Sequence, residues 1–240
     1  MYVRVLEPLG TPPGQRLPDL VRIILIDPTG RLKQFNKLRE AFRSQLEDKF
    51  NNLDPNWLRQ AHLRFQVQYR SDEPSNQEKA GFGKLDFPVY LLELQHTSDI
   101  IQSLMTQHKI PKTINGHNLY DIAKQCWEQR DTLGCGIPSG DGLRKIGFVK
   151  SHRIFDVASG DLSRAFVNET AHEIGHMGNL LRHSKTGLMT YPVPLNVDID
   201  FNNEDKRLFL SDLQRLRRLQ EQITVSNPKP RIREFRWVFR

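Results

Sequence analysis

The sequence predicts an α+β fold in which helices back a twisted mixed β-sheet, followed by an amphipathic C-terminal helix. Three observations predict it. Short β-branched or alternating runs indicate strands. Apolar residues recurring every three to four positions indicate helices. Strand, helix and strand follow one another in the first third of the chain, which predicts a β-α-β opening. The 240 residues suffice for one large domain or two small ones.

The N-terminal elements are the clearest. Residues 1–19 are rich in Pro and Gly and are predicted to be an extended lead-in. A β-branched run predicts a buried strand over 21–26, and strict alternation predicts a strand with one solvent-facing side over 63–69. Between them, a helix over about 34–51 is predicted by five residues at helical spacing: Phe35, Leu38, Phe42, Leu46 and Phe50.

The middle of the chain adds a loop, a strand and two helices. The polar stretch 71–86 contains Pro74 and two glycines, which predicts an exposed loop. A third strand is predicted over 88–94, and helices over about 98–108 and 118–130.

The second half is predicted to hold a strand pair and two helices. Residues 146–149 and 154–157 form the predicted strand pair, and one of them would be an edge strand able to pair with an extended peptide. A helix is predicted over about 161–177. Leucines at helical spacing over 208–219 predict the amphipathic last helix.

Composition fits a globular protein with exposed polar loops. Hydrophobic residues make up 38%, charged residues 26%, and the net charge is +7. No stretch approaches the ~20 apolar residues of a membrane span, and the first residues lack the apolar core of a signal peptide. We therefore expect a cytoplasmic protein, one exported without a signal peptide, or a mature fragment.

Residues 172–176 read H-E-x-x-H and carry the strongest chemical signal. Residues four apart lie on one face of a helix, so His172 and His176 can bind one metal ion. Glu173 lies about 100° further round the helix and can reach a water on that ion. The segment thus supplies two ligands and a general base.

A third histidine, His183, follows His176 by seven residues. On a continuous helix it would lie about 10 Å further along the axis, and zinc–nitrogen bonds of about 2.0 Å could not span that gap. A shared ion requires the helix to end between them. Gly178 and Asn179 are the residue types that most readily adopt φ > 0 and end a helix.

These residues resemble the metzincin clan of zinc endopeptidases, whose pattern is H-E-x-x-H-x-x-G-x-x-H followed by a turn carrying a methionine. Residues 187–192 look like that turn. The resemblance implies a zincin-like fold with an active-site helix and a C-terminal helix after the methionine turn. It implies one catalytic Zn²⁺, Met189 as an apolar floor, and Tyr191 as a metal ligand or oxyanion donor. Here the third histidine is one residue late, and Asn179 stands at the family glycine.

The hypothesis is a zinc-dependent metalloendopeptidase in which Glu173 is the general base and the substrate is a protein or peptide. We expect residues 1–240 to form a single catalytic domain. Its upper subdomain would span about 20–178 with an insertion at about 71–140, its lower subdomain about 179–225, and a basic tail 226–240.

The identity of the third metal ligand has one alternative. Glu204 could be the third ligand, as in the gluzincin branch, although Asn202 or Asn203 capping a helix, with Glu204 complementing its dipole, explains the segment more simply. His183 is therefore the favoured ligand.

Two further features bear on function. Residues 134–138 resemble a cysteine-switch core, but an incidental thiol at Cys135 in a Gly/Pro loop is favoured, and a bridge to Cys126 is possible. The basic, aromatic segment 228–240 would suit nucleic acid, yet we favour a tail folded on the domain and do not expect a nucleic-acid partner. Two alternative functions remain: a zinc-binding recognition module with little or no turnover, and a nucleic-acid-binding protein that uses the basic C-terminal tail.

Overall fold

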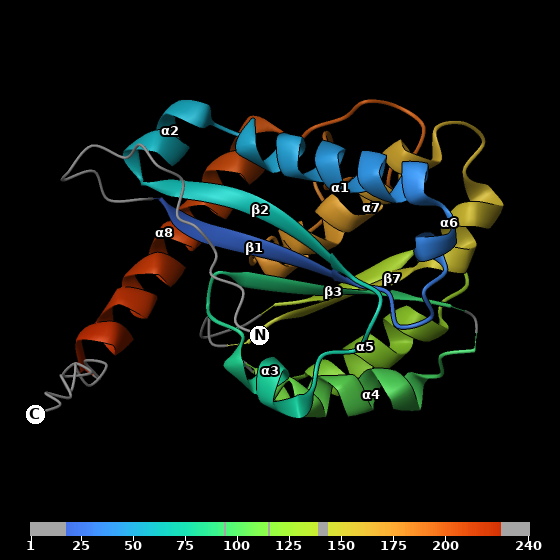
Figure 1. The fold of residues 1–240 in the computed structure, drawn as a ribbon, viewed down its shortest axis with the longest axis horizontal. Coiled ribbons are helices and arrows are strands. Elements are labelled where there is room, and N and C mark those ends of the chain that lie inside the picture. The colour runs from blue at the N-terminus through green and yellow to red at the C-terminus, as the bar shows by residue number, and fades with distance from the viewer. Residues whose placement is uncertain (1–17, 94, 115, 139–143, 227–240) are drawn as a thin grey trace, which may run out of the picture.

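The computed structural model describes residues 18–93, 95–114, 116–138 and 144–226, and its centre is a five-stranded sheet (Figure 1). The strand order is β2-β1-β3-β7-β6. Neighbouring strands run parallel except β6, which pairs antiparallel with β7 at one edge. The strands span β1 (Asp19–Ile26), β2 (Leu63–Arg70), β3 (Asp86–Leu92), β6 (Gly134–Ile137) and β7 (Ile146–Lys150). The predicted mixed sheet is confirmed.

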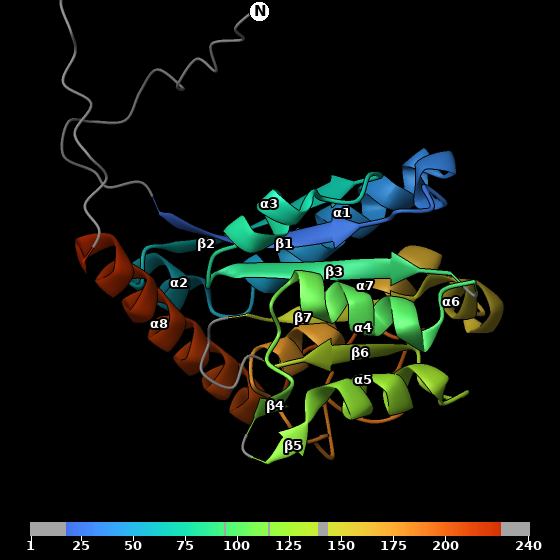
Figure 2. The same cartoon turned by 90° about the horizontal axis from the view of Figure 1, so that it is seen from below.

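Helices cover both faces of the sheet (Figures 1 and 2). Helices α1 (Asn36–Asn51), α7 (Leu162–Met177) and α8 (Asn203–Ser226) pack on one face, whereas α4 (Ser98–Gln107) and α5 (Leu119–Glu128) pack on the other. In β1 the alternate residues Val21, Ile23 and Leu25 join the first core, and Ile24 and Ile26 join the second. Both faces of this interior strand are apolar because helices cover both.

The shorter elements complete the chain. They are the 3-10 turn η1 (Leu32–Gln34), the helices α2 (Pro55–Gln60), α3 (Asn76–Gly81) and α6 (Ser151–Val157), and the two-stranded ribbon of β4 (Thr113–Ile114) and β5 (His117–Asn118). The predicted strands over 21–26, 63–69 and 88–94 are confirmed to within two residues at each end. So are the helices over 34–51, 98–108, 118–130 and 161–177, while the last helix is longer than predicted.

The strand pair predicted from 146–149 and 154–157 is wrong in its second member. Residues 154–157 belong to helix α6, where Phe155 packs on Phe166 of α7 with ring centroids 5.4 Å apart. A four-residue apolar run does not distinguish a strand from a short buried helix. The true partner of β7 is β6, which was expected to be a Gly/Pro loop.

The exposed loop predicted over 71–86 contains helix α3. The hydroxyl of Ser75 accepts the Glu78 N–H, and the Glu78 carboxylate accepts the Ser75 N–H, so a capping box starts the helix. Lys79 is buried and donates to Glu73 and Gln107. The polar composition of residues 71–86 therefore did not mean that every residue of the segment is exposed.

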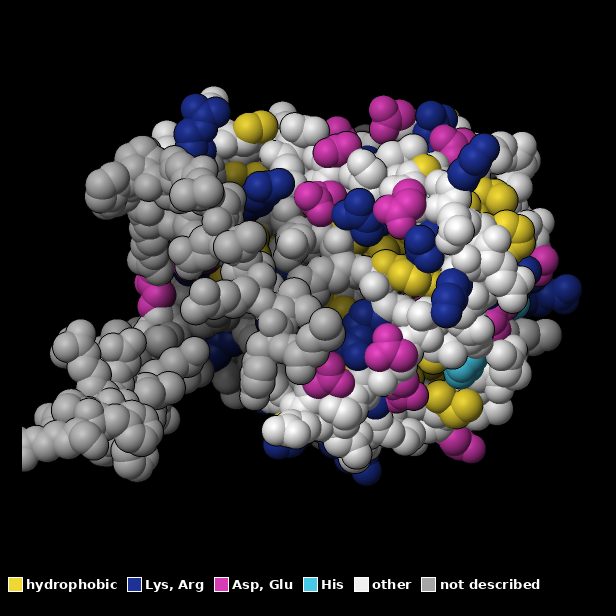
Figure 3. Space-filling view, in the orientation of Figure 1, with side chains coloured by type: hydrophobic (Ala, Val, Ile, Leu, Met, Phe, Trp, Pro, Cys, Tyr) yellow, Lys and Arg dark blue, Asp and Glu magenta, His cyan; other side chains and the backbone are white. Residues whose placement is uncertain are grey.

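The described surface mixes both signs of charge. On the coloured part of the face in Figure 3, Lys and Arg side chains alternate with Asp and Glu. Residues 227–240 of the predicted basic tail and 1–17 of the predicted lead-in lie outside the described residues. Among the helices that the structure describes, none combines the length and apolar character needed to cross a bilayer.

Candidate metal centre

Helix α7 carries the H-E-x-x-H segment through the interior of the protein. Its N-cap is Asp161, whose carboxylate accepts the N–H groups of Ser163 and Arg164 at 2.9 and 3.2 Å. The helix packs against α1 on one side and the sheet on the other. Its polar residues are buried along with the apolar ones, and His172 is only 2% exposed.

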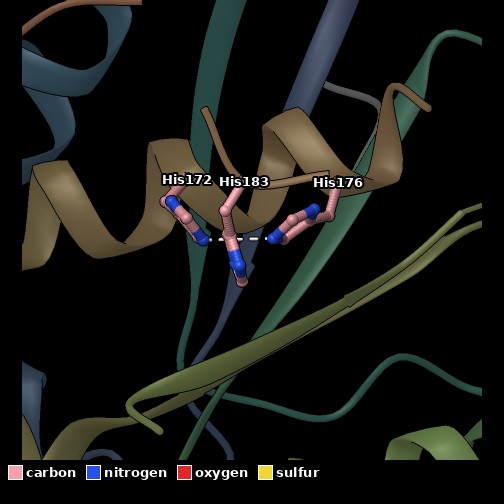
Figure 4. A group of neighbouring side chains, drawn as sticks. All are labelled: His172, His176 and His183. Carbon is pink, nitrogen blue, oxygen red and sulfur yellow. Dashed lines mark hydrogen bonds between the residues drawn. The ribbon is translucent and has the colours of Figure 1, made fainter. Parts of the chain in front are cut away.

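Three imidazoles converge beside this helix (Figure 4). The Nε2 atoms of His172 and His176 lie 3.1 Å apart. One nitrogen of each of His172, His176 and His183 lies within 4.8 Å of the others. The ring of His183 has its centroid 5.3 Å from that of His172 and 5.2 Å from that of His176. The side chains predicted to be metal ligands are therefore close enough to share one ion.

The helix ends after Met177, between His176 and His183. Asn179 has φ +65°, the Asn179 N–H donates to the His176 carbonyl, and the Leu180 N–H donates to the Gly175 carbonyl, each at 3.0 Å. This is the Schellman arrangement, with Asn179 as the left-handed residue. Gly178 has φ −91° and is not left-handed. Glycine is required at this position because a Cβ there would lie 2.4 Å from Cε2 of Phe209.

Backbone carbonyls orient the two helical histidines. The Nδ1 of His172 lies 2.9 Å from the Leu188 carbonyl, and the Nδ1 of His176 lies 2.6 Å from the Leu180 carbonyl. A proton on each Nδ1 leaves Nε2 as a free lone pair. Burial lowers the pKa of His172 to about 3 and that of His176 to about 4. Both rings are therefore neutral, the state that binds a metal.

The separation of these nitrogens fits zinc. Two nitrogens bound to tetrahedral Zn²⁺ at about 2.0–2.1 Å lie about 3.3 Å apart, close to the 3.1 Å between the Nε2 atoms of His172 and His176. A set of imidazoles suits Zn²⁺, Cu, Fe or Ni, whereas Ca²⁺ and Mg²⁺ take oxygen ligands. Three imidazoles also leave a fourth position open, as catalytic zinc sites do.

A buried carboxyl pair lies next to the histidines. Glu173 and Glu169 are 4% and 1% exposed, and one oxygen of each has no hydrogen-bond partner. Both reach over Gly134 of β6, where a Cβ would lie 2.6 Å from Glu173 Oε1 and 2.7 Å from Glu169 Oε1. Burial, and then the charge of Glu169, raises the pKa of Glu173 well above its usual range.

Glu169 was not singled out from the sequence. Burial raises its pKa to about 7. The available signal was its position three residues before His172, which puts it on the same side of the helix one turn earlier.

The histidines open onto a cleft of about 580 Å³. Helix α5, strand β6 and the segment 181–193 form its walls. Seven Leu, Ile and Val residues contribute to the lining: Ile114, Leu119, Ile122, Leu133, Ile137, Leu181 and Val193. Tyr191 also lines the cleft. It is 51% exposed and stacks on His183 with ring centroids 5.2 Å apart.

Met189 lies against helix α7 at Gly175. It is fully buried, and its Sδ approaches Gly175 so closely that a Cβ on Gly175 would lie 2.5 Å from it. Glu204 is exposed in the first turn of α8 and is outside the three-histidine group. The Asn202 side chain accepts the Asp205 N–H at 2.9 Å, as the capping interpretation predicted.

Cys126 and Cys135 are both free thiols. Gly134 and Gly136 meet α7, so Cys135, between them, projects to the other face of β6, where it joins the core under α4 and α5. Its side chain is therefore part of that core, although the residue also lines the cleft. The expected loop around Cys135 is instead the edge strand of the sheet.

The solved structures that are similar to this fold include an archaemetzincin and a zinc-dependent peptidase. Archaemetzincin from Methanopyrus kandleri shares 12% sequence identity over 80% of this chain and 95% of that one, with a TM-score of 0.44. A zinc-dependent peptidase from Methanocorpusculum labreanum (strain Z) shares 15% identity over 78% and 99%, with a TM-score of 0.37. No protein-family model and no curated protein matches the sequence. At these TM-scores neither likeness decides the function, which has to come from the side chains of this chain.

Proposed function

We propose that the chain is a zinc-dependent metalloendopeptidase that binds one catalytic Zn²⁺ through His172, His176 and His183. The observation that carries the proposal is the convergence of three imidazoles, two of them fixed by carbonyls, at the wall of a cleft. A buried carboxylate with a free oxygen lies beside them. A purely structural zinc site has no use for such a carboxylate.

A zinc ion held there would polarise the scissile carbonyl and lower the pKa of a bound water towards roughly 7. Glu173 would accept the proton from that water and pass it to the leaving amine. Tyr191, stacked on His183 at the mouth of the cleft, would rotate to donate its phenol to the developing oxyanion. Met189 contributes no proton chemistry and would pack beneath the ligands.

The edge strand supports a peptide as the substrate. Strand β6 ends the sheet, and no other strand of the described residues pairs with its outer edge. An extended peptide can add to such an edge through backbone hydrogen bonds, which do not depend on sequence. The apolar lining of the neighbouring cleft suits a bulky apolar side chain next to the scissile bond.

The test compares the zinc-loaded chain with its Glu173→Gln variant on a peptide library read by mass spectrometry. We expect Glu173→Gln to keep its zinc and to lose cleavage, because only the proton acceptor is removed. Glu204→Gln is the matched control and should cleave like the parent. A Glu173→Gln variant as active as the parent would exclude the mechanism. Zinc binding without cleavage of any peptide would favour a recognition module instead.

A further inference from the structure

Helix α8 presents a row of three side chains to the segment that joins the helix break to the third histidine. Asp205, Phe209 and Asp212 are four and three residues apart, so they lie on one face of the helix. Phe209 is fully buried and Asp205 is 5% exposed. This face points inward, towards residues 178–184.

Each member of the row makes one contact with that segment. Oδ1 of Asp212 accepts the Asn179 side-chain amide at 2.9 Å. Oδ1 of Asp205 accepts the Ser184 hydroxyl at 2.8 Å. Between them, the Phe209 ring lies so close to Gly178 that no Cβ fits there. The contacts therefore hold both ends of the segment.

The held segment contains the parts of the metal centre that lie outside helix α7. Leu180 supplies the carbonyl that orients His176. His183 is exposed, and its ring stacks on His172 and Tyr191, so the backbone that carries it also has to be held in place. Its position depends on its neighbours, above all on Ser184, which follows it directly, and on the left-handed Asn179 that turns the chain back.

We propose that Asp205, Phe209 and Asp212 are positioning residues, which hold residues 178–184 so that His183 stays within reach of a metal ion bound by His172 and His176. The inference rests on the proposed zinc site. It adds that the C-terminal helix sets the affinity of that site without touching the ion. Removing a partner that orients a ligand typically costs about 10–100-fold in metal affinity, and we expect about tenfold for each polar contact.

The first experiment measures the zinc dissociation constant of the full chain by competition with a chelating indicator. Asp212→Ala removes the acceptor. Asn179→Gly removes the amide but keeps a residue that accepts φ > 0. Each should weaken zinc binding about tenfold. The double variant should bind zinc no more weakly than Asp212→Ala alone, because both changes delete the same Asn179–Asp212 hydrogen bond. Asp212→Asn, which keeps an oxygen acceptor, should recover most of the affinity. Glu204→Ala, on the exposed side of α8, should bind like the parent.

The second experiment needs no metal. Amide hydrogen exchange of the zinc-free chain should speed up at Asn179 and Leu180 in Asp212→Ala, while the interior of α7 stays protected. Ser184→Ala, a milder change, should also weaken zinc binding and keeps the test open if Asp212→Ala does not fold. Wild-type exchange and zinc affinity in both variants would overturn the inference. A parent chain that binds no zinc would instead remove the proposed function, and the exchange data would still show whether α8 holds the segment.

Discussion

Gly136 of strand β6 faces helix α7 where Glu173 and His176 lie. A Cβ at this position would be 2.2 Å from the Glu173 carbonyl oxygen and 2.8 Å from the His176 Cβ. Neither atom can rotate away, because one belongs to the backbone of a buried helix and the other is fixed to it. Gly136→Ala must therefore push the edge strand away from the helix that carries the metal centre.

The cost follows from the size of the overlap. Extra atoms in a packed interior typically cost 1–3 kcal/mol when side chains can yield. Here the backbone has to move, so we predict that Gly136→Ala lowers the free energy of unfolding by about 3 kcal/mol. Gly81, the last residue of α3, is the matched control, since a Cβ there meets nothing within 4 Å. Gly81→Ala should leave stability unchanged or raise it by up to about 1 kcal/mol.

Urea unfolding of the chelator-treated chain measures both variants free of any metal contribution. The midpoint should fall for Gly136→Ala at an unchanged m-value, and it should not fall for Gly81→Ala. If Gly136→Ala unfolds at the parent midpoint, β6 does not lie against α7 as described. The placement of Glu173 over the edge strand would then also be wrong.

Two further predictions concern a cleft residue and a buried histidine. Tyr191→Phe should lower kcat by about 10²–10³ with little change in KM, as expected for an oxyanion donor; steady-state kinetics on a cleaved peptide decides this, and an unchanged kcat removes the role. His108 accepts or donates one hydrogen bond with the Tyr90 hydroxyl at 2.8 Å, and burial lowers its pKa to about 3. Because an unfolded histidine takes up a proton near pH 6.5 and the folded one does not, stability should fall as the pH drops from about 6.5 towards 3, by up to about 1.4 kcal/mol per pH unit. Urea midpoints between pH 7 and 4 should show a shallower fall for His108→Gln, and an identical slope contradicts the prediction.

The sequence predicted those helices and strands whose own apolar side chains repeat with the period of a helix or a strand. The alternation of residue types in β1 and β2, and the helical spacing of apolar residues in α1, each indicate which side of the element faces a core. Strand β6 has no such pattern, since two of its residues, Gly134 and Gly136, have no side chain. Their need for glycine comes from α7, which follows about 40 residues later in the chain.

The residues of the candidate site also fall into those that the sequence predicts and those that only tertiary packing brings together. His172, Glu173 and His176 could be predicted from the geometry of a single helix. His183 could be predicted as the third ligand only on the condition that this helix ends between His176 and His183. The role of Gly178 did not follow, because the glycine makes room for Phe209, a residue of the distant helix α8. Likewise Asp205 and Asp212 look in the sequence like ordinary charges on an amphipathic helix, and only tertiary packing brings them to Ser184 and Asn179.

The zinc content of the purified chain and two variants, measured by elemental mass spectrometry after dialysis, tests the central claim most directly. We predict one zinc ion per chain in the parent and in Glu204→Ala, and loss of the ion in His183→Ala, because the third imidazole completes the ligand set. A zinc-free parent, or a His183→Ala variant that keeps its zinc while Glu204→Ala loses it, would contradict the account.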